Sequence, residues 1–598
     1  MHKAATVDTT PKIVTLYKCL TSRYWTGNLD NVFWREFFLL SPRLQELKQI
    51  LQETSTQDLA SNGPKIHSMY LFVVDLLLSK DEHLRIHNAL TTLQMFLSAM
   101  SNQKSSDVNF TVYLLLGNID SIDTQFSLFI RNLCDVIKTS DNAQCIHDSL
   151  SFFLCFLATL YNSSFISHIF DSYDVFTTLV TAILHQKPGF EVAIYALGLL
   201  SACDKFETVN TLRVHLSQIS EEPFFEAVLK YSIAQLIALR DEYVAIKPDD
   251  SPVSSFFSFF TIRSLPSNPD VKQEQQFATL PDKRLVMFLT IYELCTCNKR
   301  FCKFLFQFKE NDPDSPSSTL LSLASYINVH QRQSKRAYHF SMLFLILFHL
   351  QIDDPITSAL LVQSNSDLRV RMCLQRYPFP SYPAKPYVPM GYLLDICCLG
   401  IQHNAKLKIS TPIYILYLTL LHKSFAFLAQ NLIRLEYHWK ELWRFLFSFL
   451  EFCNTLINSE FSNNAPLIVE PLLNLLAYTV ANVDAFVQNT EEMVDLLYKL
   501  IRNAQILQLI LSKVSLKNRR AADYLLGVIS YLTSKASESP DSSPEELMVI
   551  IKENIESIPV AEPQVLSNIP PLRESNYRLF HKRVSRDMAE LLRNVQIS

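Results

Sequence analysis

The chain has 598 residues, of which 48% are hydrophobic and 12% aromatic, and eight are glycine. Average usage of about 7% would give roughly forty glycines. Glycine supplies the positive-φ corners of phosphate-binding loops, so its scarcity excludes Rossmann and P-loop proteins and ordinary β-sandwiches. The net charge of −4, from 54 basic and 58 acidic residues, indicates no nucleic-acid partner. The composition therefore predicts an all-α protein.

At this length a single compact core stops growing, so the chain must form several domains or a solenoid of stacked helices. We expect an armadillo/HEAT-like right-handed helical solenoid with irregular loops, with degenerate repeats of about 40–47 residues. The twelve cysteines are dispersed and many lie in apolar runs. This pattern is typical of buried thiols in the cytosol rather than of a secreted disulfide framework.

Changes in composition along the chain predict four regions. Residues 1–246 form an N-terminal armadillo-like half, and a Pro- and Ser-rich loop follows at 247–283. A C-terminal armadillo-like domain covers 284–535 and includes a proline-rich strut at 375–390. Residues 536–598 form a Ser/Pro linker with terminal helices.

Three apolar runs raise the question of a membrane span. The run 149–170 is free of charged residues and long enough to cross a bilayer, but its second half contains Asn162 and His168. The runs 337–352 and 409–433 are interrupted by histidine or lysine. We interpret all three as buried solenoid helices. An integral membrane protein of unknown function with one or two spanning helices is the alternative.

A cluster of phenylalanines interrupts the polar loop at 247–283. Apolar side chains in such a loop must be buried against the solenoid itself, a partner or a membrane surface. We therefore include these side chains among the candidate partner contacts: Phe256, Phe257, Phe259 and Phe260.

The sequence contains no recognisable catalytic or metal-binding motif. Cys295, Cys297 and Cys302 lie close together, but a fourth ligand at zinc-site spacing is lacking. The histidines are dispersed, and the signatures of zinc proteases, serine hydrolases and Walker loops are absent. We expect no enzyme activity, no cofactor and no metal.

Prolines recur every third residue from 380 to 389, which is the period of a polyproline II helix. Tyrosines are interleaved with them, and Tyr382 and Tyr387 are candidate partner contacts. The segment is either a docking strip for an aromatic groove or a rigid extended crossing with its tyrosines packed against the solenoid.

The clearest amphipathic helix is predicted at 439–457, where apolar residues recur at helical spacing. Trp439 falls inside the apolar stripe, Trp443 at its margin and Phe447 beyond it. Large aromatic side chains at such a margin are typical of interface anchors and of contacts between repeats. Trp443 and Phe447 therefore complete the list of partner-binding candidates.

Two helices are predicted near the C-terminus. Ser543, Pro544 and Glu546 form a strong helix start, because serine caps the helix and proline is favoured at its first position. Residues 559–571 end the regular array, and one more amphipathic helix follows at 574–595.

Three segments resemble, in the same order, those of a eukaryotic family of armadillo-like helical domain proteins. Residues 31–40 resemble its Phe-Trp-x-Glu-Phe-Phe-Leu-Leu element. Residues 394–404 are similar to its Leu-Asp…Ile-Asn-His-Asn segment, although Gln402 replaces an asparagine. Residues 437–443 resemble its Tyr-x-Trp-Lys-Glu-Leu-Trp signature. The chain looks like a shorter, fungal-type member, a group catalogued as predicted membrane proteins.

The resemblance implies a non-enzymatic adaptor in the cytoplasm and peripherally on the Golgi membrane. Its implied partners are a phosphatidylinositol 4-kinase and an ARF guanine-nucleotide exchange factor, which support phosphatidylinositol 4-phosphate production and vesicle trafficking. No kinase-contact residue can be matched in this sequence. A cargo-binding solenoid of the nuclear-transport type is a further alternative, although such proteins are expected to be more acidic.

Overall fold

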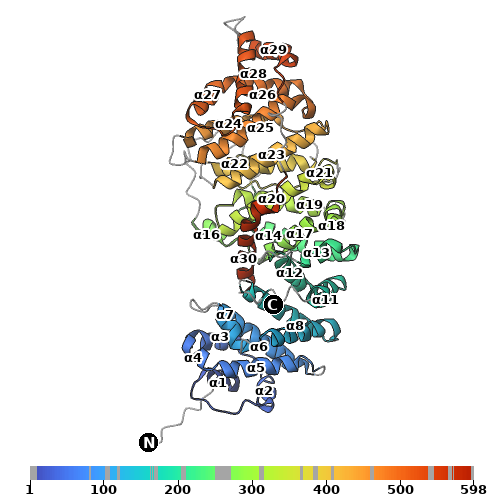
Figure 1. The fold of residues 1–598 in the computed structure, drawn as a ribbon, viewed down its shortest axis with the longest axis vertical. Coiled ribbons are helices and arrows are strands. Elements are labelled where there is room, and N and C mark those ends of the chain that lie inside the picture. The colour runs from blue at the N-terminus through green and yellow to red at the C-terminus, as the bar shows by residue number, and fades with distance from the viewer. Residues whose placement is uncertain are drawn as a thin grey trace. The chain divides into compact units, whose positions relative to one another are not determined.

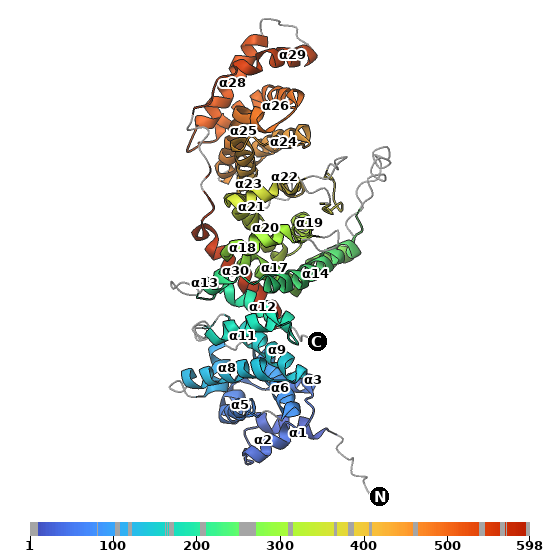
Figure 2. The same cartoon turned by 90° about the vertical axis from the view of Figure 1, so that its right-hand side faces the viewer.

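The structure is a computed structural model of the chain. The residues that it describes are 10–79, 82–101, 108–117, 122–161, 163, 166, 173–203, 211–249, 271–308, 315–363, 368–380, 388–405, 410–457, 464–536, 544–562, 569 and 571–593. All regular elements in these residues are helices (Figures 1 and 2). The predicted all-α fold is therefore confirmed.

The chain folds into two compact units. Unit 1 comprises Met1–Gln235, Asp282–Phe301 and Leu579–Ser598, and unit 2 comprises Leu236–Pro281 and Cys302–Arg578. The sequence-based regions differ from this division, because they assign neither 284–301 nor the last twenty residues to the N-terminal half. Three helices contribute residues to both units: α14 (Glu222–Ile246), α18 (Lys299–Gln307) and α30 (Glu574–Arg593).

Unit 1 is built from helices that stack in successive rows. In the main row α3 packs against α6, α6 against α9, α9 against α12 and α12 against α17. Its helices are α1 (Lys12–Thr21), α2 (Asn31–Phe37), α3 (Leu44–Glu53), α4 (Thr56–Ser61), α5 (Gly63–Leu76), α6 (His83–Ser101), α7 (Val108–Leu116), α8 (Ile122–Thr139), α9 (Ala143–Leu160), α11 (Tyr173–Leu184), α12 (Phe190–Ser201), α13 (Thr211–Gln218), the 3₁₀ turn η3 (Lys283–Leu285), α17 (Val286–Cys297) and most of α30 (Glu574–Arg593).

Unit 2 repeats the same architecture. One row runs from α20 through α23 and α25 to α28, and a second runs from α24 through α26 to α29. Its helices are α16 (Val271–Thr279), α19 (Pro316–Val329), α20 (Lys335–Asp353), α21 (Pro355–Leu361), α22 (Pro389–Ala405), α23 (Thr411–Gln430), α24 (Trp439–Ile457), α25 (Ala465–Phe486), α26 (Thr490–Arg502), α27 (Ala504–Lys513), α28 (Arg520–Ala536), α29 (Pro544–Asn554) and the 3₁₀ turn η5 (Ile555–Ser557). Such rows, in which each layer contacts its neighbours, are those of a helical-repeat solenoid.

Side-chain caps explain how these helices begin with so little glycine. Asp30, Asn142 and Ser334 each accept a hydrogen bond from a backbone N–H in the first turn of the helix that follows. Two glycines remain where helices approach closely: a Cβ on Gly198 would lie 2.1 Å from Thr290 Oγ1, and one on Gly400 would lie 2.4 Å from the Tyr417 hydroxyl. The few glycines are thus used for packing as well as for turns.

Three sequence-based expectations need correction. The loop predicted at 247–283 contains helix α16, and its last residue, Lys283, begins the turn η3. The proline-rich strut does not extend to Pro389, because this residue begins α22, a position at which proline is well tolerated. The apolar run 149–170 is not one helix, since α9 ends at Leu160.

The helices predicted from the three apolar runs lie in the packed interior of the units. Within the described residues, α9, α23 and α25 are long and apolar enough to cross a membrane, and α20 joins them if it is counted with α21, at a bend of 105°. In the apolar windows of α9, α23 and α25, 83%, 67% and 61% of the residues are buried inside the protein. Helices that are apolar on all sides occur both in protein cores and in membranes.

Candidate partner-binding site

An extended segment, 368–380, crosses helix α19 and is held by a row of serines on that helix. The serines are Ser318, Ser322 and Ser325, at spacings of four and three residues, so they share one face of α19. Backbone groups of alternate residues in an extended chain recur at a similar distance. The resulting hydrogen bonds join the Ser318 hydroxyl to the Arg369 carbonyl (2.8 Å), the Ser322 hydroxyl to the Arg371 carbonyl (2.5 Å) and the Cys373 N–H to the Ser325 hydroxyl (3.0 Å).

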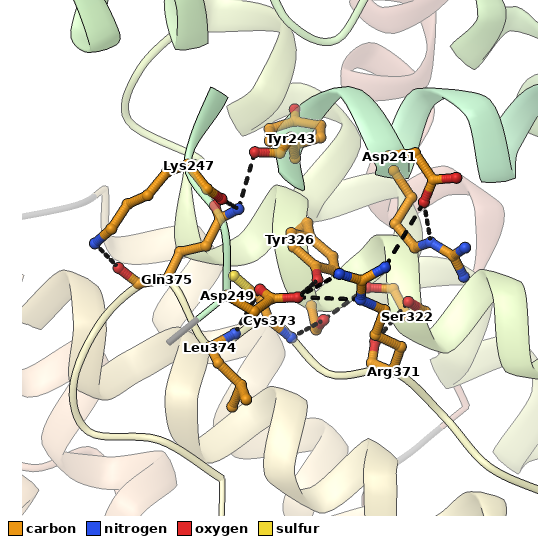
Figure 3. A network of polar contacts seen from close by, with 12 residues as sticks. Asp241, Tyr243, Lys247, Asp249, Ser322, Tyr326, Arg371, Cys373, Leu374 and Gln375 are labelled. Atoms are coloured by element: carbon orange, nitrogen blue, oxygen red, sulfur yellow. Dashed lines mark hydrogen bonds and ion pairs between the residues drawn. The ribbon is translucent and has the colours of Figure 1, made fainter. Parts of the chain in front are cut away.

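Asp249 connects this segment to the end of α14. Its Oδ2 accepts hydrogen bonds from the Tyr326 hydroxyl at 2.6 Å and from Arg371 Nε and Nη2 at 3.0 and 2.9 Å (Figure 3). Its Oδ1 accepts one from the Leu374 N–H at 3.2 Å. The side chain of Asp249 is only 15% exposed, so these donors replace most of its water.

Gln375 forms the second connection and is buried. Its side-chain N–H₂ donates to the carbonyl of Tyr243 at 2.9 Å and to that of Lys247. The Lys247 ammonium donates in return to the Gln375 carbonyl (Figure 3). His330 Nε2 lies 2.7 Å from Gln375 Oε1. We refer to the whole set as the Asp249 network: Tyr243, Lys247, Asp249, Tyr326, His330, Arg371 and Gln375.

The protonation states suit these hydrogen bonds. Burial, followed by the hydrogen bond to Asp249, raises the pKa of Tyr326, so its hydroxyl keeps its proton and donates. Burial lowers the pKa of His330 to about 4, so the ring is neutral at pH 7 and Nε2–H donates to Gln375. Burial also lowers the pKa of Arg371, but Tyr326 and Asp249 outweigh that effect and raise it. Near neutral pH Tyr326, His330 and Arg371 are therefore all in the form that donates hydrogen bonds.

The Asp249 network stands next to two of the predicted partner-binding segments. Asp249 directly precedes residues 250–270, which contain the phenylalanine candidates, and 368–380 directly precede 381–387, which contain Tyr382 and Tyr387. Both segments lie outside the described residues. The two segments are more than one hundred residues apart in the sequence. The residues that precede them are nevertheless joined to one another by hydrogen bonds.

The expected exposure of Trp443 and Phe447 is wrong. Trp443 is 0% exposed and Phe447 is buried as well. The Trp443 ring stacks on Trp439 at 5.3 Å, and its Nε1–H donates to the Glu492 carbonyl at 3.0 Å. Helix α26 packs on α24 and covers the margin of the stripe, so both side chains belong to the core of unit 2 and are unavailable to a partner.

The cysteines have structural surroundings. In the described part of the chain, no group of three or more His, Cys, Asp or Glu side chains could hold a metal ion. Arg213 Nε donates to Cys297 Sγ at 3.3 Å. Burial raises the pKa of Cys145 to about 11 and those of Cys155 and Cys453 to about 12, which keeps these thiols protonated and unreactive.

Comparison with known proteins decides the family. Residues 387–594 match the family model described as armadillo-like helical domain-containing protein 3, C-terminal. The chain is 54% identical to the UPF0588 membrane protein of Schizosaccharomyces pombe over 593 residues, which cover 99% of both chains. The chain therefore belongs to the family of armadillo-like helical domain proteins that includes this relative. It is also 21% identical to armadillo-like helical domain-containing protein 3 of Homo sapiens, over 83% of this chain and 78% of the relative, and 21% identical to that of Danio rerio, over 79% and 75%.

Two of the three segments that carry the family resemblance, 394–404 and 437–443, have structural roles in unit 2. The Tyr437 hydroxyl donates to Asp395 Oδ1 at 2.6 Å and so links α22 to the start of α24. Burial raises the pKa of Asp395 to about 7. Asn404 Nδ2 donates to the Asn328 carbonyl at 3.1 Å and joins α22 to α19. These motifs therefore maintain the fold that positions the Asp249 network.

Proposed function

We propose that the chain is a non-enzymatic helical-repeat adaptor on the cytosolic face of Golgi membranes. Its protein partners are a phosphatidylinositol 4-kinase and an ARF guanine-nucleotide exchange factor, and its role is to support phosphoinositide production and ARF-dependent trafficking. Membership of the armadillo-like family supports a helical scaffold.

The observation that carries the proposal is the Asp249 network. Its hydrogen bonds hold the chain just before both segments that contain the candidate side chains. Two segments that start from chain positions held together can contact one partner together, and a fixed starting point lowers the entropy that is lost when they bind. We therefore propose that Phe256, Phe257, Phe259 and Phe260 act together with Tyr382 and Tyr387.

Affinity capture from the native cell tests this proposal. The wild-type chain should retain both the kinase and the exchange factor. Replacing the four phenylalanines with serine, or both tyrosines with alanine, should reduce recovery at least tenfold, because aromatic anchors carry most of the binding energy of an interface. Val560→Ser is the matched control, since Val560 is an exposed apolar residue elsewhere in unit 2.

The proposal fails if the wild-type chain retains neither partner. The proposed contact residues are wrong if the phenylalanine and tyrosine variants both recover as much of the partners as the wild type and the Val560→Ser control.

An integral membrane protein is the second candidate. Two observations favour it: the relative from Schizosaccharomyces pombe is named a membrane protein, and three described helices are long and apolar enough to span. However, α9 would have to leave a packed interior in which most of its side chains are buried. An integral protein needs detergent to leave the membrane, whereas a peripheral adaptor is released by alkaline carbonate.

A further inference from the structure

Helix α30 returns the end of the chain to unit 1 and has two faces of opposite character. From Leu579 onward it belongs to unit 1. One face is buried and mostly apolar, and its members recur at helical spacing: Val584, Ser585, Met588, Ala589 and Leu592.

Polar contacts at both ends of this segment set which face points inward. His581 Nε2 lies 2.6 Å from Oε1 of the buried Glu293, and its ring stacks on Tyr292 at 5.5 Å. Arg213 Nε contacts the other carboxylate oxygen of Glu293 at 3.3 Å. At the far end, Arg593 Nε donates to the carbonyl of Ala158 on α9 at 2.8 Å. The part of α30 from Leu579 onward is therefore held at both ends within unit 1.

The opposite face of α30 is exposed and carries cations. Leu579, Lys582, Arg583 and Arg586 follow one another at spacings of three, one and three residues, so they form one stripe along the helix. Leu579 is 77% exposed, Arg583 and Arg586 are exposed and Lys582 is half-exposed. Within the described residues none of the three cations has an acidic partner within 4 Å. We call these four residues the basic stripe.

We propose that the basic stripe binds the anionic surface of a phospholipid membrane. A surface lysine or arginine normally lies among charges of both signs, and the whole chain is slightly acidic, with a net charge of −4. Three cations within five residues on one exposed face are therefore a local feature, which ends before the exposed Glu590, and they are complementary to the anionic lipids of a cytosolic leaflet. The inner face of α30 is already buried against unit 1 and the basic stripe is exposed, so the stripe can contact lipid while α30 stays folded.

Leu579 favours a lipid bilayer over a soluble polyanion as the ligand. A leucine in water next to cations gains from burial between lipid headgroups, whereas it gains nothing from a phosphate or a nucleic acid. The inference deepens the proposed function, since a peripheral adaptor needs a surface that faces the membrane. It uses residues of unit 1 only and none of the partner-contact candidates.

Vesicle co-sedimentation of the full chain tests the assignment. The probes are vesicles of phosphatidylcholine alone and of phosphatidylcholine with about 30% phosphatidylserine. The wild-type chain should bind only the anionic vesicles, and binding should weaken as salt rises from about 0.1 to 0.5 M because the charges are screened. The variant Lys582→Glu/Arg583→Glu/Arg586→Glu should bind roughly 100-fold more weakly, from about fivefold for each cation.

A matched control carries the same change in charge elsewhere. Lys517, Arg519 and Arg520 are exposed residues of unit 2 around the start of α28, and their triple replacement by glutamate should change binding by less than about twofold. Leu579→Ser keeps every charge, alters a side chain that the fold does not bury, and should weaken vesicle binding roughly tenfold.

Several results would overturn the proposal. They are a wild-type chain that ignores anionic vesicles, equal binding to phosphatidylcholine alone, or equal losses for the α30 and control triple variants. Competition by inorganic polyphosphate together with no effect of Leu579→Ser would assign the stripe to a soluble polyanion instead. Capture of the kinase and the exchange factor is measured in the same α30 variants. These variants keep the partner-contact candidates, so they should still retain both partners if the proposed function is right, whether or not the stripe binds lipid.

Discussion

Around Trp439 and Trp443, unit 2 is held together by apolar contact between helices, whereas around Asp249 it is held by hydrogen bonds to an extended segment. The tryptophans are buried among aromatic rings, with Phe425 and Phe486 beside Trp439. The carboxylate of Asp249 instead depends on a hydroxyl, a guanidinium and a backbone N–H. Apolar burial has no preferred direction, but hydrogen bonds do. The first region should therefore determine how stable unit 2 is, and the second how one segment is positioned on it.

The largest effect is expected from the tryptophans. Trp439→Ala and Trp443→Ala should each lower the free energy of unfolding by about 3–5 kcal/mol, because both side chains are fully buried and leave cavities. Urea denaturation followed by circular dichroism measures both values.

The control for this pair is Lys440→Ala on the exposed face of the same helix. Its ion pair with Glu491 is long, at 3.6 Å, and both side chains are more than half exposed, so the change should stay within about 0.5 kcal/mol. A Trp443→Ala variant that is as stable as the wild type would contradict the burial described here.

A smaller loss of stability, with a local signature, is expected at Asp249. Asp249→Ala leaves the Tyr326 hydroxyl and the Leu374 N–H without an acceptor and should cost about 2–3 kcal/mol. Amide hydrogen exchange should accelerate at 369–375 and remain unchanged in α24.

Exchange that accelerates equally in both places would mean that the network supports unit 2 as a whole and does not act on one segment. Asp241→Ala is the control, since Asp241 is 53% exposed and lies 3.9 Å from Arg371.

Protonation of His330 should lower the stability of the protein at acidic pH. Its pKa is lowered to about 4 in the folded protein against 6.5 in the unfolded chain, so the unfolded chain binds the proton more tightly. The stability from neutral His330 is complete above pH 6.5 and is lost as pH falls from 6.5 to 4. Between pH 7 and pH 5 the loss should be roughly 1–2 kcal/mol.

His330→Gln should remove this part of the acid sensitivity, which urea midpoints at pH 7 and pH 5 would measure. The comparison is with the wild type, because burial also lowers the pKa of His403 and His422 to about 4. An unchanged difference between the two pH values would contradict the account of His330.

The smallest effect is expected at Arg371. Its side chain is 44% exposed, so the ion pair with Asp249 is partly screened by water. Arg371→Ala should cost less than about 1 kcal/mol, since Asp249 keeps its bonds to Tyr326 and Leu374. A loss as large as that of Asp249→Ala would show that the guanidinium, rather than the buried donors, dominates the network.

These two regions also mark what sequence alone could predict. The helix at 439–457 and the burial of Trp439 follow from local periodicity. The burial of Trp443 does not, because it depends on the packing of α26 and Phe425 around it, which is a tertiary property. Asp249 and Arg371 are 122 residues apart, and no local pattern relates them. The spacing of Ser318, Ser322 and Ser325 was a visible signal of a polar helix face, but it did not reveal which segment binds there.

Alkaline carbonate extraction of membranes from the native cell tests the central claim most directly. If α9, α20, α23 and α25 form the interior of a helical-repeat adaptor, carbonate should release the wild-type chain into the supernatant together with known peripheral proteins. Recovery only after detergent, together with a known spanning protein, would contradict the account, because it would place at least one of these helices in the lipid.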